Sequence, residues 1–232
     1  MIAIETATPL ERLRAFARPG GEAALRRVRG VRLTLRGEIR LVPNARWTPF
    51  AAEQTIDAAV SAFRWTARLR MGPFGAIPVT VTDGYEGGHG SMVVRAGILP
   101  PARSEGPDFD KGEMQRYLAE VVLCPPALWL NPALEWTDVA DSMVRIRDRA
   151  VDGTVDLTIG DEGEPLSCRA DRPRSVAGRT VVTSWSGTYG EPAEWQGFRI
   201  PTRLEATWHL EDGPFAYVRE EVTALALDGD VS

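Results

Sequence analysis

The stretch Gly106–Pro132, GPDFDKGEMQRYLAEVVLCPPALWLNP, carries the strongest helix signal in a chain that otherwise reads as short strands and turns. Asp110 stands at a position typical of a helix N-cap, and Glu113 follows three residues later in a capping-box pattern. The helix should end near Leu123, because the next residue precedes a proline, and Ala127–Leu130 can form a second short turn. The apolar residues between these points recur at helical spacing and are Met114, Tyr117, Leu118, Val121 and Val122.

The apolar stripe of this helix predicts that the segment covers the concave face of a curved sheet. We expect the stripe to pack into the sheet, with Tyr117 at its border. Glu113, Arg116 and Glu120 lie on the other side of the helix. A water-exposed row of ion pairs, with Arg116 and Glu120 facing solvent, is the simpler interpretation of these three residues. A buried polar network in a cleft is the alternative.

The composition is that of an ordinary soluble globular protein, with 44% hydrophobic and 25% charged residues. A net charge of −5 argues against nucleic acid as a partner. Cys124 and Cys168 predict two buried free thiols, and we expect neither a metal site nor a cofactor. The N-terminal sequence lacks the features of a signal peptide, and no stretch approaches the ~20 apolar residues that span a bilayer. We therefore expect a cytoplasmic protein without a transmembrane segment.

Outside the central helix, most of the chain shows the two-residue periodicity of β-strands. Thr8 can cap a short helix over Pro9–Ala17, and a second helix is expected over Glu22–Val28. The expected strands are Val31–Val42, Ala45–Phe50, Glu53–Ala58, Ala62–Arg70, Ile77–Asp83, Ser91–Ala96, Leu134–Val139, Met143–Arg149, Thr154–Ile159, Leu166–Arg172, Thr180–Ser184, Arg203–Leu210 and Ala216–Leu227.

Turn sequences such as Asp83-Gly84 and Gln196-Gly197 separate these strands, which predicts antiparallel pairing. Because few helices are available to cover so large a sheet, the sheet should curl. The expected fold class is mainly β (α+β), a strongly curved antiparallel sheet or incomplete β-barrel with a central helical lid and short N-terminal helices. One domain is expected, with N-terminal helices in 1–30, first strands in 31–104, the lid in 106–132 and the remaining strands in 133–228.

The glycine-rich segment Asp83–Met92, DGYEGGHGSM, collects several polar side chains. It matches neither of the common phosphate-binding glycine motifs, and a hairpin loop is its simpler interpretation. His89 is the histidine best suited to act as a base.

Seven tryptophans are many for a chain of this length. Core packing explains most of them, whereas a cavity lined by aromatic rings would suit an apolar small molecule. Two residues apart on a late strand, Tyr217 and Arg219 should share one face of the sheet. The candidate ligand-binding residues are Trp65, Tyr85, Tyr117, Trp129, Trp185, Trp208, Tyr217 and Arg219.

Several short motifs are spread over the chain from about residue 37 onward. They are Trp47-x-x-Phe50, Phe63-x-Trp65, Asp83-x-Tyr85, Gly90-Ser91-Met92, Glu113-x-x-Arg116-Tyr117-Leu118-Ala119-Glu120, Trp185-x-Gly187, Gly197-x-Arg199-Ile200-Pro201 and Tyr217-x-Arg219. Together they resemble a family of uncharacterised bacterial proteins, and RYLAE followed by a proline is the most specific of them. The resemblance brings no catalytic residues with it. The order of strands and helix is also similar to that of the lipoprotein-carrier (LolA/LolB-like) fold, which implies an incomplete barrel that holds acyl chains.

Two functions fit these observations. The first is the binding of an apolar or lipid-like small molecule in the cavity of a half-barrel. The alternative is a cofactor-free biosynthetic enzyme of the cyclase or isomerase type that uses the same cavity. Its catalytic candidates are Arg116, Glu120, Tyr217 and His89. A purely structural domain would instead show no cavity and a large apolar outer patch. The sequence leaves the oligomeric state open.

Overall fold

The strands account for most of the chain in the computed structural model, which describes residues 7–18, 25 and 28–229. They are β1 Gly30–Ile39, β2 Thr48–Asp57, β3 Phe63–Met71, β4 Ile77–Glu86, β5 His89–Ala96, β6 Ala102–Glu105, β7 Leu134–Ala140, β8 Met143–Asp148, β9 Thr154–Ile159, β10 Pro165–Val176, β11 Arg179–Trp195, β12 Phe198–Leu210 and β13 Gly213–Asp228.

Helices are few and short among the described residues. The α-helices are α1 Pro9–Ala17, α2 Pro107–Glu120 and α3 Ala127–Leu130, and the 3-10 turns are η2 Pro73–Gly75 and η3 Val121–Leu123. Thr8 caps α1 with the full capping box, as the sequence predicted. The second N-terminal helix, expected over Glu22–Val28, falls mostly outside the described residues.

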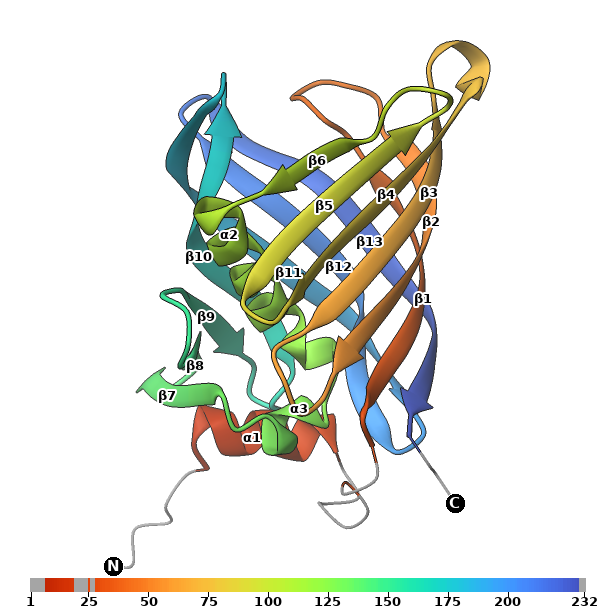
Figure 1. The fold of residues 1–232 in the computed structure, drawn as a ribbon. Helices are drawn as coiled ribbons and strands as arrows, with labels where there is room; N and C mark the ends of the chain where they lie inside the picture. The colour runs from red at the N-terminus through yellow and green to blue at the C-terminus, as the bar shows by residue number, and fades with distance from the viewer. Residues whose placement is uncertain (1–6, 19–24, 26–27, 230–232) are drawn as a thin grey trace, which may run out of the picture.

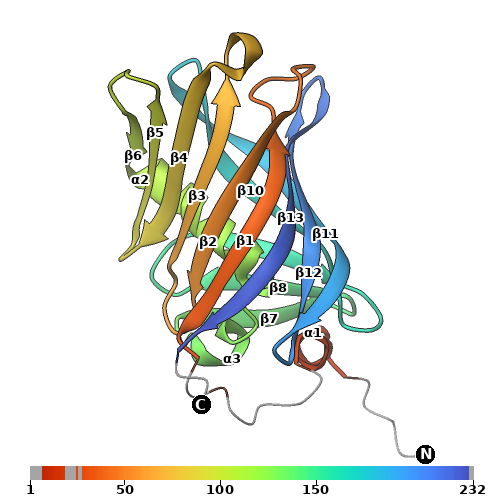
Figure 2. The same cartoon turned by 90° about the vertical axis from the view of Figure 1, so that its right-hand side faces the viewer.

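A single antiparallel sheet of 13 strands contains all of these strands, in the order β6-β5-β4-β3-β2-β1-β13-β12-β11-β10-β9-β8-β7. Strands β1 and β13 pair at its centre, so the first and last strands of the chain lie side by side (Figures 1 and 2). Its two free edges, β6 and β7, are the strands that flank the helical segment in sequence. The sheet curls strongly and does not close, which confirms the predicted incomplete barrel.

Helix α2 occupies the gap that the unclosed sheet leaves. It contacts β4, β5 and β6 on one side and β8, β9 and β10 on the other, as Figure 1 shows. Its buried residues therefore lie all around the helix and include Gly112, Glu113, Met114, Gln115, Tyr117, Leu118 and Ala119. The expectation of one apolar face and one solvated face was wrong, because strands on both sides of the gap cover most of the surface of the helix.

The start of α2 also differs from the prediction. The helix begins at Pro107, with Gly106 at the N-cap position and no side-chain cap. Asp110 accepts a hydrogen bond from the backbone N–H of Gly90 on β5 (2.8 Å) and so ties the helix to the sheet. The predicted end and the turn at Ala127–Leu130 agree with the structure.

Most predicted strands are present, although β11 and β12 are longer than the predicted Thr180–Ser184 and Arg203–Leu210. There are three further differences. The two strands expected over 45–58 are the single strand β2, and β6 was not predicted. Asp83-Gly84 is not a turn but lies inside β4, and the β4–β5 hairpin turns at Gly87-Gly88. The segment 83–92 is thus a hairpin of two long strands whose inward side chains can reach α2.

The end of the sheet opposite the β1–β2 and β3–β4 loops is covered by α1 and α3 (Figure 1). Leu13, Phe16 and Ala17 of α1 are buried, and Arg14 donates a hydrogen bond to the carbonyl of Leu128 on α3 (2.8 Å). Cys124 and Cys168 are buried free thiols, as predicted. Among the described residues, no helix combines the length and the apolar character needed to cross a bilayer.

Gly90→Ala should loosen the contact of α2 with β5. A Cβ at position 90 would lie 2.9 Å from the Cβ of Glu113 and 2.9 Å from the carbonyl oxygen of Phe109, so the helix would have to move. We expect a loss of about 1–3 kcal/mol in the free energy of unfolding, measured by urea denaturation. Gly190→Ala on β11 is the matched control, because its Cβ would come no closer than 4.0 Å to the Arg203 side chain. Equal stabilities of the two variants would contradict the close packing of α2.

Candidate functional site

Arg116 is the centre of a buried charge cluster between α2 and the sheet. Its Nη1 donates to Asp83 Oδ2 on β4 (2.5 Å), and its Nε donates to Glu120 Oε1 one turn along the helix (2.8 Å). The guanidinium also lies over the rings of Phe63 and Trp65, about 5 Å from each centroid. The side chains of Arg116 and Glu120 keep only 16% and 14% of their exposure. The ion pair is therefore held in a largely desolvated site, where loss of one partner is costly.

Two further polar residues extend this cluster across the sheet. Gln54 of β2 donates to Glu120 Oε2 (2.5 Å), and Glu220 of β13 accepts a hydrogen bond from Trp65 Nε1 (3.0 Å). Burial, and secondarily the nearby Glu120 carboxylate, raises the pKa of Glu220 to about 7. Glu220 is therefore a carboxyl group that exchanges its proton near neutral pH.

Arg172 of β10 is a second buried guanidinium, 6% exposed. Its Nη2 donates to the carbonyl of Gly112 on α2 (2.6 Å) and lies 3.8 Å from Glu113 Oε1. Burial, reinforced by Asp83, raises the pKa of Glu113 to about 8. We call the set Gln54, Asp83, Glu113, Arg116, Glu120, Arg172 and Glu220 the polar layer.

Aromatic side chains form the wall above the polar layer. The guanidinium carbon of Arg172 lies over the ring of Trp185 on β11, 4.7 Å from its centroid. The Nε1–H of Trp185 donates to the Tyr217 hydroxyl (3.2 Å). Trp208 stacks on Tyr217, with ring centroids 5.9 Å apart. Tyr217 is the extra residue of a β-bulge, since Ala206 pairs with Val218 and Thr207 with Ala216. The bulge turns Tyr217 inward and puts Arg219 on the outer face.

The inward-facing positions change from buried to half-exposed along the strands. On β1 they run from Val31 and Leu35, each 1% exposed, to the half-exposed Ile39, and on β12 from the fully buried Ile200 to the half-exposed Trp208. The concave face is therefore filled at the end closed by α1 and α3, and open to water at the other end. We call the half-exposed inward residues the mouth, and they are Ile39, Leu69, Val81, Ala206, Trp208, Tyr217 and Val218.

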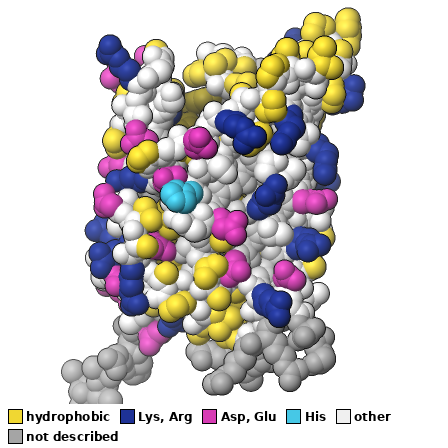
Figure 3. All heavy atoms as spheres, in the orientation of Figure 1, with side chains coloured by type: hydrophobic (Ala, Val, Ile, Leu, Met, Phe, Trp, Pro, Cys, Tyr) yellow, Lys and Arg dark blue, Asp and Glu magenta, His cyan; other side chains and the backbone are white. Residues whose placement is uncertain are grey.

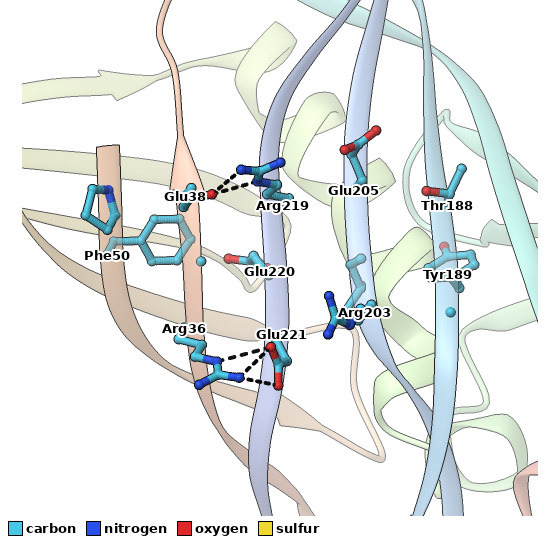
Figure 4. Close-up of a pocket in the computed structure, with 14 residues that line it drawn as sticks. Arg36, Glu38, Phe50, Thr188, Tyr189, Arg203, Glu205, Arg219, Glu220 and Glu221 are labelled. Atoms are coloured by element: carbon cyan, nitrogen blue, oxygen red, sulfur yellow. Dashed lines mark hydrogen bonds and ion pairs between the residues drawn. The ribbon is translucent and has the colours of Figure 1, made fainter. Parts of the chain in front are cut away.

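A second concavity, of about 720 Å³, opens on the outer face of the sheet, and its lining also includes Phe50, Tyr189 and Glu220. Figure 4 shows it as a groove across β1, β13, β12 and β11, between two rows of charged side chains. Arg36 pairs with Glu221, and Arg219 pairs with Glu38. Because these charges are already paired and exposed, the groove is better explained as a ladder of surface ion pairs than as a ligand site.

The structure brings together four of the predicted ligand-binding residues and separates the others. Trp65, Trp185, Trp208 and Tyr217 line the concave face with Arg116 and Glu120. Three residues lie in the filled half, where Tyr85 and Tyr117 are 2% and 1% exposed and Trp129 is on α3. The last predicted ligand-binding residue, Arg219, lies on the outer face of the sheet, outside the cup that the curled sheet forms. The catalytic candidate His89, at the β4–β5 hairpin, also lies outside the cup, with an 84% exposed side chain.

The sequence held a signal for the polar layer that the prediction missed. Gln54 lies between Ala52 and Ile56 in the inward phase of β2, and Glu220 lies between Val218 and Val222 on β13. A polar residue that interrupts an apolar alternation in this way must be buried with a partner. Asp83 follows the same rule between Val81 and Tyr85, although the prediction placed it in a loop.

Comparisons with known proteins agree with this architecture. A family model described as "Family of unknown function (DUF6544)" matches residues 11–220, which confirms the resemblance to an uncharacterised family. A solved DUF1329 family protein from Desulfovibrio piger is similar with a TM-score of 0.50 at 9% identity, over 97% of this chain and 96% of that one. A LolA superfamily protein from Nitrosomonas europaea is similar with a TM-score of 0.49 at 14% identity, over 95% and 92% of the two chains. A search of curated proteins finds no match. At these identities the solved structures show a fold likeness alone.

Glu113→Gln should flatten the pH dependence of stability. The folded protein keeps the Glu113 proton up to a pKa of about 8, whereas the ordinary value is 4.5. The stability that this protonated carboxyl contributes is full below the ordinary pKa and is lost as the pH rises toward the folded pKa. Glutamine cannot ionise, so the free energy of unfolding of the Glu113→Gln variant should fall less than that of the parent protein between about pH 5 and 8.

The control for this comparison is Glu53→Gln, which changes an exposed carboxyl of β2. This variant should follow the pH curve of the parent protein. If the curve of Glu113→Gln also runs parallel to that of the parent, the buried neutral carboxyl is refuted.

Proposed function

The chain belongs to the DUF6544 family of unknown function, and from that premise we propose that it binds an apolar or lipid-like small molecule in the mouth of its half-barrel. The observation that carries the proposal is the set of apolar side chains that face inward and yet stay half-exposed. A soluble protein normally buries the apolar concave face of a sheet, and a half-exposed one suits a ligand that completes the packing.

The polar layer defines how deep such a ligand can reach. Below it, inward residues such as Leu33, Ala67 and Ile200 are fully buried, so the lower half of the cup is packed with side chains. The ligand space that we propose is therefore the upper half alone. Its floor is the Arg116 cluster, and its wall is the Trp208–Tyr217 stack.

The rim of the mouth is itself apolar. Phe74 at the β3–β4 tip and Ile98 at the β5–β6 loop are fully exposed, and Leu41 in the β1–β2 loop is 66% exposed. The space-filling view shows hydrophobic side chains gathered at this end of the molecule (Figure 3). An apolar rim supports the entry of an apolar ligand at this end. The cytoplasmic location expected from the N-terminal sequence stays a prediction.

Ala206→Trp should block ligand binding without unfolding the protein. Ala206 is half-exposed on the concave face, so an indole there would fill the mouth instead of overpacking the core. The probe is N-phenyl-1-naphthylamine, a neutral apolar dye whose fluorescence rises on binding. We expect the parent protein to bind it and the variant to bind it at least about tenfold more weakly.

Val182→Trp is the matched control, because Val182 is 68% exposed on β11 and away from the mouth. It should bind the dye like the parent. Failure of the parent protein to bind the dye, or equal affinity of the two tryptophan variants, would refute the proposed site.

One observation favours the alternative function, a cofactor-free enzyme that uses the same cup. Glu220 has a pKa of about 7 and lies at the floor beside Trp65, so it can both donate and accept a proton at neutral pH. Arg116 and Tyr217, two of the predicted catalytic residues, lie on the same concave side of the sheet, where both could hydrogen-bond a substrate. His89 is outside the cup and has no place in such a reaction.

Glu220→Gln distinguishes an enzyme from a carrier. Small molecules that co-purify with the parent and with the variant would be extracted and compared by liquid chromatography and mass spectrometry. An enzyme should accumulate unreacted substrate in the variant and product in the parent, whereas a carrier should hold the same compound in both. Glu221→Gln on the outer face is the control and should match the parent. Identical extracts from all three proteins would exclude catalysis by Glu220.

A further inference from the structure

Two arginine side chains converge on one aromatic ring in the wall of the mouth. The guanidinium carbons of Arg172 and Arg174, on the concave face of β10, each lie 5.8 Å from the ring centroid of Trp208. Two guanidinium charges beside the same ring repel each other, and the repulsion grows where water is excluded. A negatively charged group between the two guanidiniums would offset this repulsion.

The protein supplies little negative charge at this place. Arg172 has one carboxylate oxygen within 4.0 Å, that of Glu113 at 3.8 Å, and for Arg174 no ion pair or hydrogen bond occurs with the described residues. Burial and the neighbouring Asp83 keep Glu113 protonated at neutral pH, since they raise its pKa to about 8. Of the other carboxyl groups of the polar layer, Asp83 and Glu120 are bound to Arg116, and Glu220 accepts a hydrogen bond from Trp65.

Hydrogen-bond donors at the same ring also lack acceptors. The Nε atoms of Arg172 and Arg174 are buried and have no partner within the part of the chain that the structure describes. The Tyr217 hydroxyl, stacked beside Trp208, accepts from Trp185 and donates to no described residue. Burial raises the pKa of Tyr217, so this hydroxyl keeps its proton to donate. A buried donor without an acceptor is costly, and three of them around one ring define a site built for an acceptor.

We infer that Arg172, Arg174 and Tyr217 bind the anionic head group, a carboxylate or a phosphate, of an amphipathic ligand whose apolar chain lies in the mouth. The inference rests on the proposed function and adds the charge of the ligand to it. The head group would accept charge-assisted hydrogen bonds from the two guanidiniums and a hydrogen bond from the phenol. Trp208 and Val218 would contact the first part of the chain.

The test compares three ligands that share one alkyl chain. Binding of dodecanoate, dodecyltrimethylammonium and dodecanol, each below its micelle concentration, is measured by calorimetry on the full chain. We expect dodecanoate to bind at least about tenfold more tightly than the other two, the gain from one charge-assisted hydrogen bond. Inorganic phosphate, added alone, should bind much more weakly than dodecanoate because it lacks the chain.

Variants then locate the head group. Arg174→Gln, at a half-exposed position without ion pairs, should weaken dodecanoate about tenfold and leave dodecanol unchanged. Tyr217→Phe should have a smaller effect in the same direction. Arg169→Gln, an exposed position on the outer face of β10, is the matched control and should bind dodecanoate like the parent.

The outcomes separate this inference from the proposed function. Equal affinity for all three alkyl ligands, or no change of dodecanoate affinity in Arg174→Gln, overturns the anion site and leaves the apolar mouth in place. Tight phosphate binding equal to that of dodecanoate overturns the assignment to an amphipathic ligand. No binding of any alkyl ligand overturns the proposed function as well.

Discussion

A sheet that curls without closing leaves one gap, and the rest of this structure depends on how that gap is filled. The two edges, β6 and β7, are joined in sequence by the helical segment, so the chain that leaves one edge must cross the gap to reach the other. Helix α2 lies in this gap and packs on strands near both edges of the sheet. Without it, both edges and the concave face would meet water. The position of α2 is therefore set by topology before any single contact is considered.

This position converts ordinary helix residues into a buried polar layer. The part of α2 that lies between the strands must bury the charges it carries there, which are Glu113, Arg116 and Glu120. The strands place Gln54, Asp83 and Arg172 at inward positions opposite these charges, so that most of the charges have partners. A buried network of this kind adds little net stability compared with apolar packing. In the function that we propose, this layer is the floor of the binding space.

The outer groove and the mouth illustrate why a large concavity is not by itself a site. The groove is a hollow of about 720 Å³ on the outer face, but Arg36, Glu38, Arg219 and Glu221 along it are paired with one another across strands. In the mouth, by contrast, apolar side chains are half-exposed, and the Nε donors of Arg172 and Arg174 beside Trp208 have no acceptor among the described residues. Unsatisfied groups, rather than volume, indicate where a ligand belongs.

The sequence by itself determined most of the strands, the main helices and the curl of the sheet, because these follow from local periodicity and from the number of strands that so few helices can cover. The sequence also singled out Trp65, Trp185, Trp208 and Arg116 as candidate site residues, but it could not show that they lie on the same concave face. The phase of α2 was decided only by the tertiary structure, since a helix enclosed on both sides does not follow its own apolar stripe. The separation of Tyr217 from Arg219 likewise depends on a bulge that the pairing of β12 with β13 creates. Alternation along one strand cannot reveal such a bulge, because the extra residue exists only relative to the partner strand.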